Sequence, residues 1–127
     1  MTEIFCVGAG GFLGANLRYG LNKLFAAASI SLPMGTLFSN IIAGFFIGAF
    51  IAAESIAGLP TGRQKLFLTT GLLGGLSTFS AFSLETVQLF QSGRFLLAAA
   101  NVGLNVCLSI LGVILGMAAV KLLLKQS

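Results

Sequence analysis

The sequence contains no histidine, so metal sites built on imidazole ligands and histidine general bases are excluded. Charge is also scarce: charged residues make up 8% of the chain, against about 25% in a typical soluble domain. The only two cysteines, Cys6 and Cys107, lie in apolar stretches without metal-ligand spacing and are interpreted as packed thiols. Because no base and nucleophile can be paired, we expect no enzymatic activity.

What the chain has in abundance is apolar residues, which make up 57% of its 127 residues and give a mean hydropathy of +1.03. A soluble domain of this composition would lack the polar surface to cover its core. Four apolar stretches, about residues 3–25, 34–55, 64–91 and 94–124, match spans of roughly 20 residues. The sequence therefore predicts an all-α, multi-pass membrane protein, with one transmembrane domain over residues 1–127 and four transmembrane helices.

The third stretch is longer than a span requires. Its 28 residues would extend about 42 Å at about 1.5 Å per residue, against about 30 Å of hydrocarbon. Tilting would absorb the excess. However, Gly74 and Gly75 can leave helical geometry at little steric cost, and the hydroxyl-rich run after them can bond released backbone groups. We therefore expect the third helix to be broken at Gly74–Ser77.

Basic residues are nearly balanced between the two ends of the predicted spans. The net charge is +4, and no basic cluster indicates nucleic-acid binding. With four spans, the side that holds both termini and the second loop carries Arg63, Lys65, Lys121 and Lys125. The opposite side carries Arg18, Lys23 and Arg94. Because an excess of Lys and Arg marks the cytoplasmic side, either the chain inserts both ways, which would allow an antiparallel dimer, or the translocation machinery reads the weak bias.

Several amides and hydroxyls lie inside the predicted spans. Asn40 lies within the second stretch, and Asn101, Asn105 and Ser109 follow one another at intervals of four on the fourth. Polar side chains in spans face the bundle interior or a wet path more often than lipid. Two readings stay open: the amides clamp helices together, at about 1 kcal/mol or less each, or they offer N–H donors to an anion.

Phe79 and Phe82 are spaced i, i+3 among hydroxyl residues, just after the expected break. Either they pack in the core, or they present the electropositive edges of their rings to an anion. Glu85 is an acid within the same stretch. It is interpreted as a proton-coupling acid, a hydrogen-bond partner of nearby Ser or Thr, or an ion-pair partner of Arg18, and these three alternatives stay open.

The segment from Gly71 to Glu85, GLLGGLSTFSAFSLE, resembles the signature of the Fluc/CrcB family of fluoride channels. Supporting matches are Gly10-Gly11 with Arg18, and Pro33-Met34-Gly35-Thr36 leading to Asn40 and Gly44. The resemblance implies a fluoride-selective channel for passive export, which lowers cytoplasmic fluoride. It also implies an antiparallel, dual-topology homodimer with two pores, in the lipid of a prokaryotic inner (plasma) membrane.

The resemblance also implies roles for individual residues. Phe79 and Phe82 would line the pores edge-on, and Asn40 would be the pore amide of the second helix. The other polar pore residues would be Ser80, Ser83, Asn105 and Ser109. Backbone carbonyls of Gly74 and Ser77 would bind a structural sodium ion at the dimer axis. Ala81 stands where many relatives have Thr, so a hydroxyl relay along this helix loses one member.

Two other functions compete with a channel. The first is a small dual-topology, proton-coupled exporter that uses Glu85; against it, the first stretch has no acid at its centre, and the chain has no Trp and a single Tyr. The second is a membrane assembly protein that transports nothing. Dependence of transport on a proton gradient would indicate the first, and liposomes that pass no ion would indicate the second.

Overall fold

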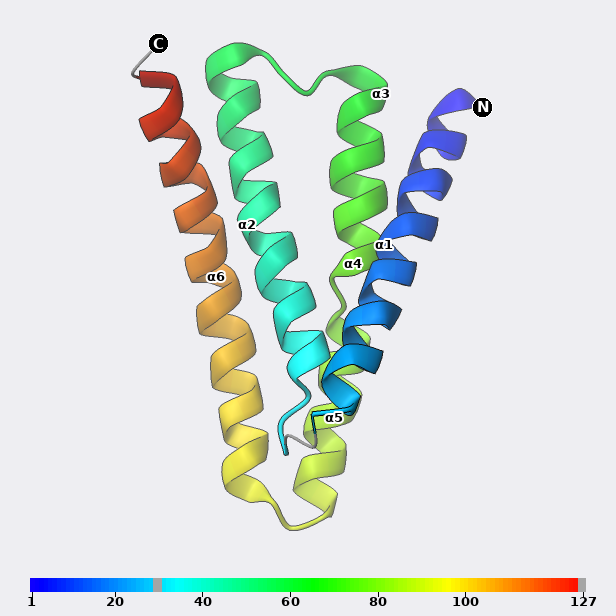
Figure 1. Cartoon of the computed structure of the whole chain (residues 1–127), viewed down its shortest axis with the longest axis vertical. Helices are drawn as coiled ribbons and strands as arrows, with labels where there is room; N and C mark the ends of the chain where they lie inside the picture. Colours follow the sequence, from blue (N-terminus) through cyan, green and yellow to red (C-terminus); the bar gives the residue numbers. More distant parts are fainter. Residues whose placement is uncertain (29–30, 126–127) are drawn as a thin grey trace.

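The computed structural model describes residues 1–28 and 31–125, and these ranges contain helices and no strand, which confirms the all-α prediction. Long helical paths run side by side along the molecule (Figure 1). The elements in chain order are α1 (Thr2–Ala26), α2 (Met34–Ala57), α3 (Gly62–Lys65), the π-helix η1 (Leu66–Leu73), α4 (Gly74–Leu76), α5 (Phe79–Gln91) and α6 (Phe95–Lys125). The segments from α3 to α5 together form the third path.

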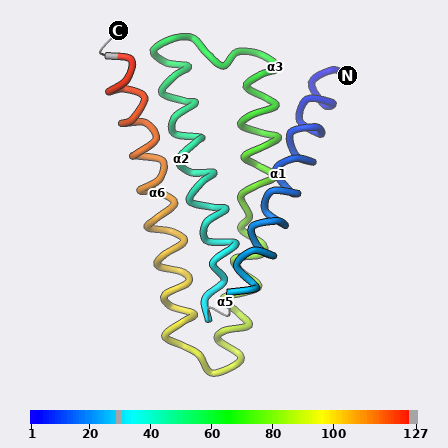
Figure 2. The backbone as a smooth tube through the Cα atoms, viewed as in Figure 1, coloured from blue at the N-terminus to red at the C-terminus, as the bar shows by residue number. Residues whose placement is uncertain are grey.

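The helical paths alternate in direction. The N-terminus, the α2–α3 connection and the end of α6 lie at one end of the molecule, and the α5–α6 turn lies at the other (Figures 1 and 2). The turns use glycines where the backbone requires them: Gly58 after α2 and Gly93 before α6 have φ of 68° and 75°, a region that other residues rarely adopt. The N-terminus, the end of α6 and the connection after α2 therefore lie at the same end of the molecule, as the count of basic residues assumed (Figures 1 and 2).

Three paths are long and apolar enough to cross a membrane: Met34–Ala57, Gly62–Gln91 and Phe95–Leu124. The chain is therefore a multi-pass membrane protein. Helix α1 has 25 residues, which suffices in length. It is not among the helices that are apolar enough to qualify by composition. Its role as a fourth span stays a prediction.

Glycines bring the helix backbones close together. Helix α1 packs along η1 and α4, and α2 packs along α6. A Cβ added to Gly75 would lie 2.7 Å from the carbonyl oxygen of Gly11, and one added to Gly44 would lie 2.7 Å from that of Ser109. Both distances are too short for a carbon atom, so these contacts admit only glycine.

The interruption of the third path lies at the end of the predicted range, Gly74–Ser77, and extends one residue beyond it. Gly74 and Gly75 stay helical in α4, and the extended residues are Ser77, with ψ of 154°, and Thr78, with φ of −155° and ψ of 125°. The prediction that the glycines leave helical geometry is therefore wrong. Gly75 instead allows the close approach of α4 to the backbone of Gly11.

A pocket at the helix interruption

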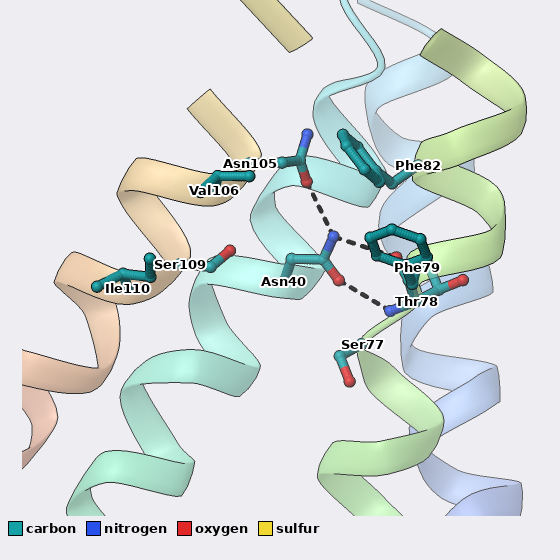
Figure 3. A pocket seen from close by; sticks show the side chains of 9 residues that line it. All are labelled: Asn40, Ser77, Thr78, Phe79, Phe82, Asn105, Val106, Ser109 and Ile110. Atoms are coloured by element: carbon teal, nitrogen blue, oxygen red, sulfur yellow. Dashed lines mark hydrogen bonds between the residues drawn. The ribbon is translucent and has the colours of Figure 1, made fainter. Parts of the chain in front are cut away.

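A pocket of about 350 Å³ lies where α2 and α6 face the interruption between α4 and α5 (Figure 3). It brings together predicted site residues from three separate stretches of the chain. The pocket is lined by Asn40, Ser77, Thr78, Phe79, Phe82, Asn105, Val106, Ser109 and Ile110. Its wall thus combines amides, hydroxyls, aromatic rings and aliphatic side chains.

Asn40 on α2 binds the backbone of the extended segment. Its Oδ1 accepts a hydrogen bond from the Thr78 N–H at 2.8 Å, and its Nδ2 donates to the Thr78 carbonyl at 3.3 Å (Figure 3). In an unbroken helix the Thr78 N–H would bond to the carbonyl of Gly74. One side chain therefore satisfies both backbone groups of a residue that has left the helix.

Thr78 in turn caps the start of α5. Its Oγ1 accepts from the Ala81 N–H at 3.1 Å, an N-cap interaction typical of Thr. In an unbroken helix that N–H would bond to the carbonyl of Ser77. The N–H groups that would bond to the carbonyls of Gly74 and Ser77 in an unbroken helix thus have other acceptors, and the interruption likewise separates the carbonyls of Gly75 and Leu76 from α5. Gly74 and Ser77 are the two positions predicted to bind sodium.

The two aromatic rings lie on the first turn of α5 and differ in burial. Their centroids are 5.4 Å apart and their planes are inclined by 55°. Phe82 is 9% exposed, whereas Phe79 is 79% exposed in the single chain. Phe82 therefore packs inside the bundle, and Phe79 presents most of its ring outward.

The structure does not bring Ser80 and Ser83 into this pocket. The Ser83 hydroxyl donates to the Phe79 carbonyl at 2.8 Å, and the Ser80 hydroxyl lies 3.3 Å from that of Thr78. Ser77, which does line the pocket, donates its hydroxyl to the Leu73 carbonyl at 2.9 Å. The polar residues that the resemblance assigns to the pore are thus divided between the pocket and the outer side of α5.

Glu85 lies outside the pocket and bonds to α2. The buried hydroxyl of Thr36 donates to its Oε1 at 2.6 Å. Within residues 1–28 and 31–125, the structure shows one ion pair, between Lys65 Nζ and Glu54 Oε1 at 2.8 Å. Of the three alternatives left open for Glu85, the structure shows the hydrogen bond to a threonine, and it shows no ion pair with Arg18 among the described residues.

Sequence reasoning missed the connections among the polar residues of α2, α5 and α6. Asn40 Nδ2 donates to Asn105 Oδ1 at 2.9 Å, and Asn105 Nδ2 donates to Asn101 Oδ1 at 3.0 Å. Asn101 Nδ2 then donates to Thr86 Oγ1 at 2.9 Å. The i, i+4 spacing of Asn101 and Asn105 was visible in the sequence, but their partners on other helices were not.

Comparisons with known proteins identify relatives of this chain. The family model described as CrcB-like protein, Camphor Resistance (CrcB), matches residues 5–117. A Clostridium novyi (strain NT) protein named fluoride-specific ion channel FluC is 44% identical over 120 residues, which cover 91% of each chain. A protein of the same name from Elusimicrobium minutum (strain Pei191) is 42% identical over 126 residues, or 98% of each chain.

A third relative, again named fluoride-specific ion channel FluC, comes from Paraburkholderia phymatum; it is 43% identical over 118 residues, covering 93% of this chain and 94% of its own. These relatives are named as ion channels, which confirms that the family is not one of enzymes. Because the family model spans most of the chain and the similarity extends over nearly its whole length, this protein belongs to the CrcB (Fluc) family.

Proposed function

We propose that this protein is a fluoride-selective channel that lets fluoride leave the cell passively and so lowers cytoplasmic fluoride. The observation that carries the proposal is the pocket, which gathers Phe79, Phe82 and Ser109 beside a helix interruption. Irregular backbone at membrane depth is tolerated where it lines a cavity or is buried in protein. The relatives named fluoride-specific ion channels support the same conclusion.

Fluoride is small and strongly hydrated, so selective passage requires groups that replace its water. Ring edges carry partial positive charge, and hydroxyls donate hydrogen bonds. Phe79 and Phe82 would supply ring edges, and Ser109 a hydroxyl. A larger anion such as chloride would be rejected by the size and spacing of these groups, as in other selectivity filters.

A second copy of the chain would complete the pathway. Phe79 is 79% exposed in one chain, and Ser80 lies on the same exposed turn. An antiparallel partner in the bacterial inner membrane would cover this ring and bring Ser80 and Ser83 next to a pore. The near balance of basic residues at the two ends supports insertion in both orientations, with α1 as the fourth span of each copy. Two pores would result, one for each pocket.

A sodium ion would fit the released carbonyls. Among the described residues no cluster of His, Cys, Asp or Glu could hold a metal ion, but the carbonyls of Gly74 and Ser77 have lost their helical partners to Asn40 and to Thr78. Carbonyl oxygens at the end of a helix carry partial negative charge and suit a hard cation. Bound there, the ion would supply a fixed positive charge that holds two chains together.

Fluoride efflux from liposomes tests the proposal. Purified protein is reconstituted in liposomes loaded with fluoride, and efflux is recorded with chloride-loaded liposomes as the control. We expect rapid fluoride efflux without an imposed proton gradient, and little chloride efflux. Equal fluxes of the two anions would contradict selectivity, and no flux of either would favour an assembly protein.

One observation favours the proton-coupled exporter as a second candidate. Glu85 Oε2 is buried and has no hydrogen-bond partner among the described residues, so a proton could reside there. For an exporter, transport would stop without a proton gradient and would be lost in Glu85→Gln. For the channel, fluoride efflux would continue when the gradient is collapsed.

A further inference from the structure

We propose that Asn40, Asn105, Asn101 and Thr86 form a directional hydrogen-bond chain, here called the amide ladder, that holds the helix interruption in its working geometry. In this proposal Asn40 is a positioning residue and not a donor to the ion. The inference deepens the proposed channel function and rests on it. The backbone groups of Thr78 determine which way the hydrogen bonds of the ladder run.

The backbone of Thr78 sets the orientation of the first amide. Its N–H can only donate and its carbonyl can only accept, so Asn40 must present Oδ1 to the first and Nδ2 to the second. The other hydrogen of that Nδ2 points to α6, where it meets Asn105 Oδ1 at 2.9 Å (Figure 3). Asn105 therefore has to turn its oxygen toward Asn40.

The orientation then passes along α6 and returns to α5. Asn105 Nδ2 donates to both the carbonyl and Oδ1 of Asn101, each at 3.0 Å. Asn101 Nδ2 donates to Thr86 Oγ1 at 2.9 Å, and the Thr86 hydroxyl donates to the Phe82 carbonyl at 2.8 Å. The ladder thus begins at the backbone of Thr78 and ends at the backbone of Phe82.

The amide hydrogens of Asn40 and Asn105 are already used within the ladder and are not available to an ion. A side-chain amide has two N–H hydrogens. Those of Asn40 go to the Thr78 carbonyl and Asn105, and those of Asn105 both go to Asn101. The Ser77 hydroxyl donates to the Leu73 carbonyl, so the donors that the pocket offers outside the ladder are the hydroxyls of Ser109 and Thr78 and the ring edges of Phe79 and Phe82.

Burial makes the ladder act as one unit. Asn101 is 1% exposed and Asn105 is 5% exposed, so water does not replace a lost partner. Turning any one amide would set donor against donor and leave buried polar groups unsatisfied, which is costly. Thr78 is the N-cap of α5 and Phe82 lies in its first turn. Breaking one hydrogen bond of the amide ladder would therefore let the rings of Phe79 and Phe82 shift.

Thr86→Val tests the ladder at its far end. Valine keeps the shape of threonine but removes the hydroxyl that Asn101 donates to, and Thr86 does not line the pocket. Thr69→Val is the matched control, because the Thr69 hydroxyl makes the same kind of bond, to the Lys65 carbonyl at 2.8 Å, and lies outside the ladder. Fluoride flux is measured in liposomes at equal amounts of folded protein.

The second readout is hydrogen exchange of the Thr78 amide, followed by mass spectrometry on the reconstituted protein. We expect Thr86→Val to lower fluoride flux roughly three- to tenfold and to speed Thr78 exchange by a similar factor, as for residues coupled in one network. Thr69→Val should match the parent in both. If Thr86→Val folds poorly, Asn101→Leu carries the same two measurements.

Four outcomes decide the proposal. Faster exchange at Thr78 together with lower flux supports it. Exchange and flux equal to those of the Thr69→Val control overturn it, and so does a change in only one of the two. If the parent itself passes no fluoride, the proposed function fails, while unchanged Thr78 exchange in Thr86→Val would separately refute the ladder.

Discussion

Replacing Asn40 by leucine should destabilise the fold more than any other apolar substitution of similar size in the pocket. The change removes three hydrogen bonds, two to the backbone of Thr78 and one to Asn105 Oδ1. Leucine has nearly the shape of asparagine, so little packing is lost. Of the partners left behind, Asn105 is buried in the bundle and Thr78 is half-buried at the pocket, so solvent satisfies them only in part.

The magnitude follows from these three bonds. Side-chain hydrogen bonds in membrane proteins contribute on average about 0.6 kcal/mol each, whereas a buried group left without a partner costs about 1–3 kcal/mol. For Asn40→Leu we therefore expect the free energy of unfolding to fall by about 2–4 kcal/mol. The assay is equilibrium unfolding in mixed micelles at several protein concentrations, which separates unfolding from dissociation of subunits.

Asn16→Leu supplies the control for this prediction. Asn16 is exposed on α1, and its Nδ2 donates to the carbonyl of Phe12 at 2.7 Å, within one helix. The same chemical change there should alter the free energy of unfolding by less than about 0.5 kcal/mol. Equal effects of Asn40→Leu and Asn16→Leu would refute the reasoning that Asn40 stabilises the interruption.

The other predictions concern the rings, the glycine contact and the orientation of the chain. Phe79→Ile should leave the stability of the single chain unchanged, because the ring is 79% exposed there, and Phe82→Ile should lower the free energy of unfolding by less than about 1.5 kcal/mol as an apolar swap. Both substitutions should strongly reduce fluoride efflux, and efflux equal to the parent's would return the rings to a packing role. Gly75→Val should prevent the close approach of α4 to Gly11 and abolish folding or flux, whereas Ser77→Ala should keep bound sodium, measured by sodium dependence of dimer stability, because the backbone is its ligand. A tag on the C-terminus should be accessible from both sides of the membrane, and labelling from the cytoplasmic side alone would argue against dual topology.

The helical framework was predictable because apolar stretches and turn residues are local signals. The predicted second stretch, 34–55, corresponds to α2, and the predicted fourth, 94–124, to α6. The i, i+3 spacing singled out Phe79 and Phe82, and the i, i+4 spacing singled out Asn105 and Ser109, four of the residues that line the pocket. Spacing left open whether these side chains pack or contact an anion. Position along a helix determines which side chains share a face.

Contacts between residues far apart in the chain could not be predicted from the sequence. The glycine pair suggested the break, but it stays helical, with Gly75 packed against Gly11, and the chain leaves the helix where Asn40 can bind Thr78, 38 positions away. Likewise, the bond between Thr36 and Glu85 joins residues 49 positions apart. Tertiary contacts of this kind override local preference, and a single sequence does not encode them in any periodic pattern.

The most direct test of the central claim is the reversal potential of the reconstituted protein in a planar bilayer. Fluoride, chloride and proton gradients are imposed with different sizes and directions, so each ion predicts its own potential. The account predicts a current that reverses at the potential of the fluoride gradient and does not move when the chloride or pH gradient is changed. A reversal potential that follows chloride or protons, or no current at all, would contradict it.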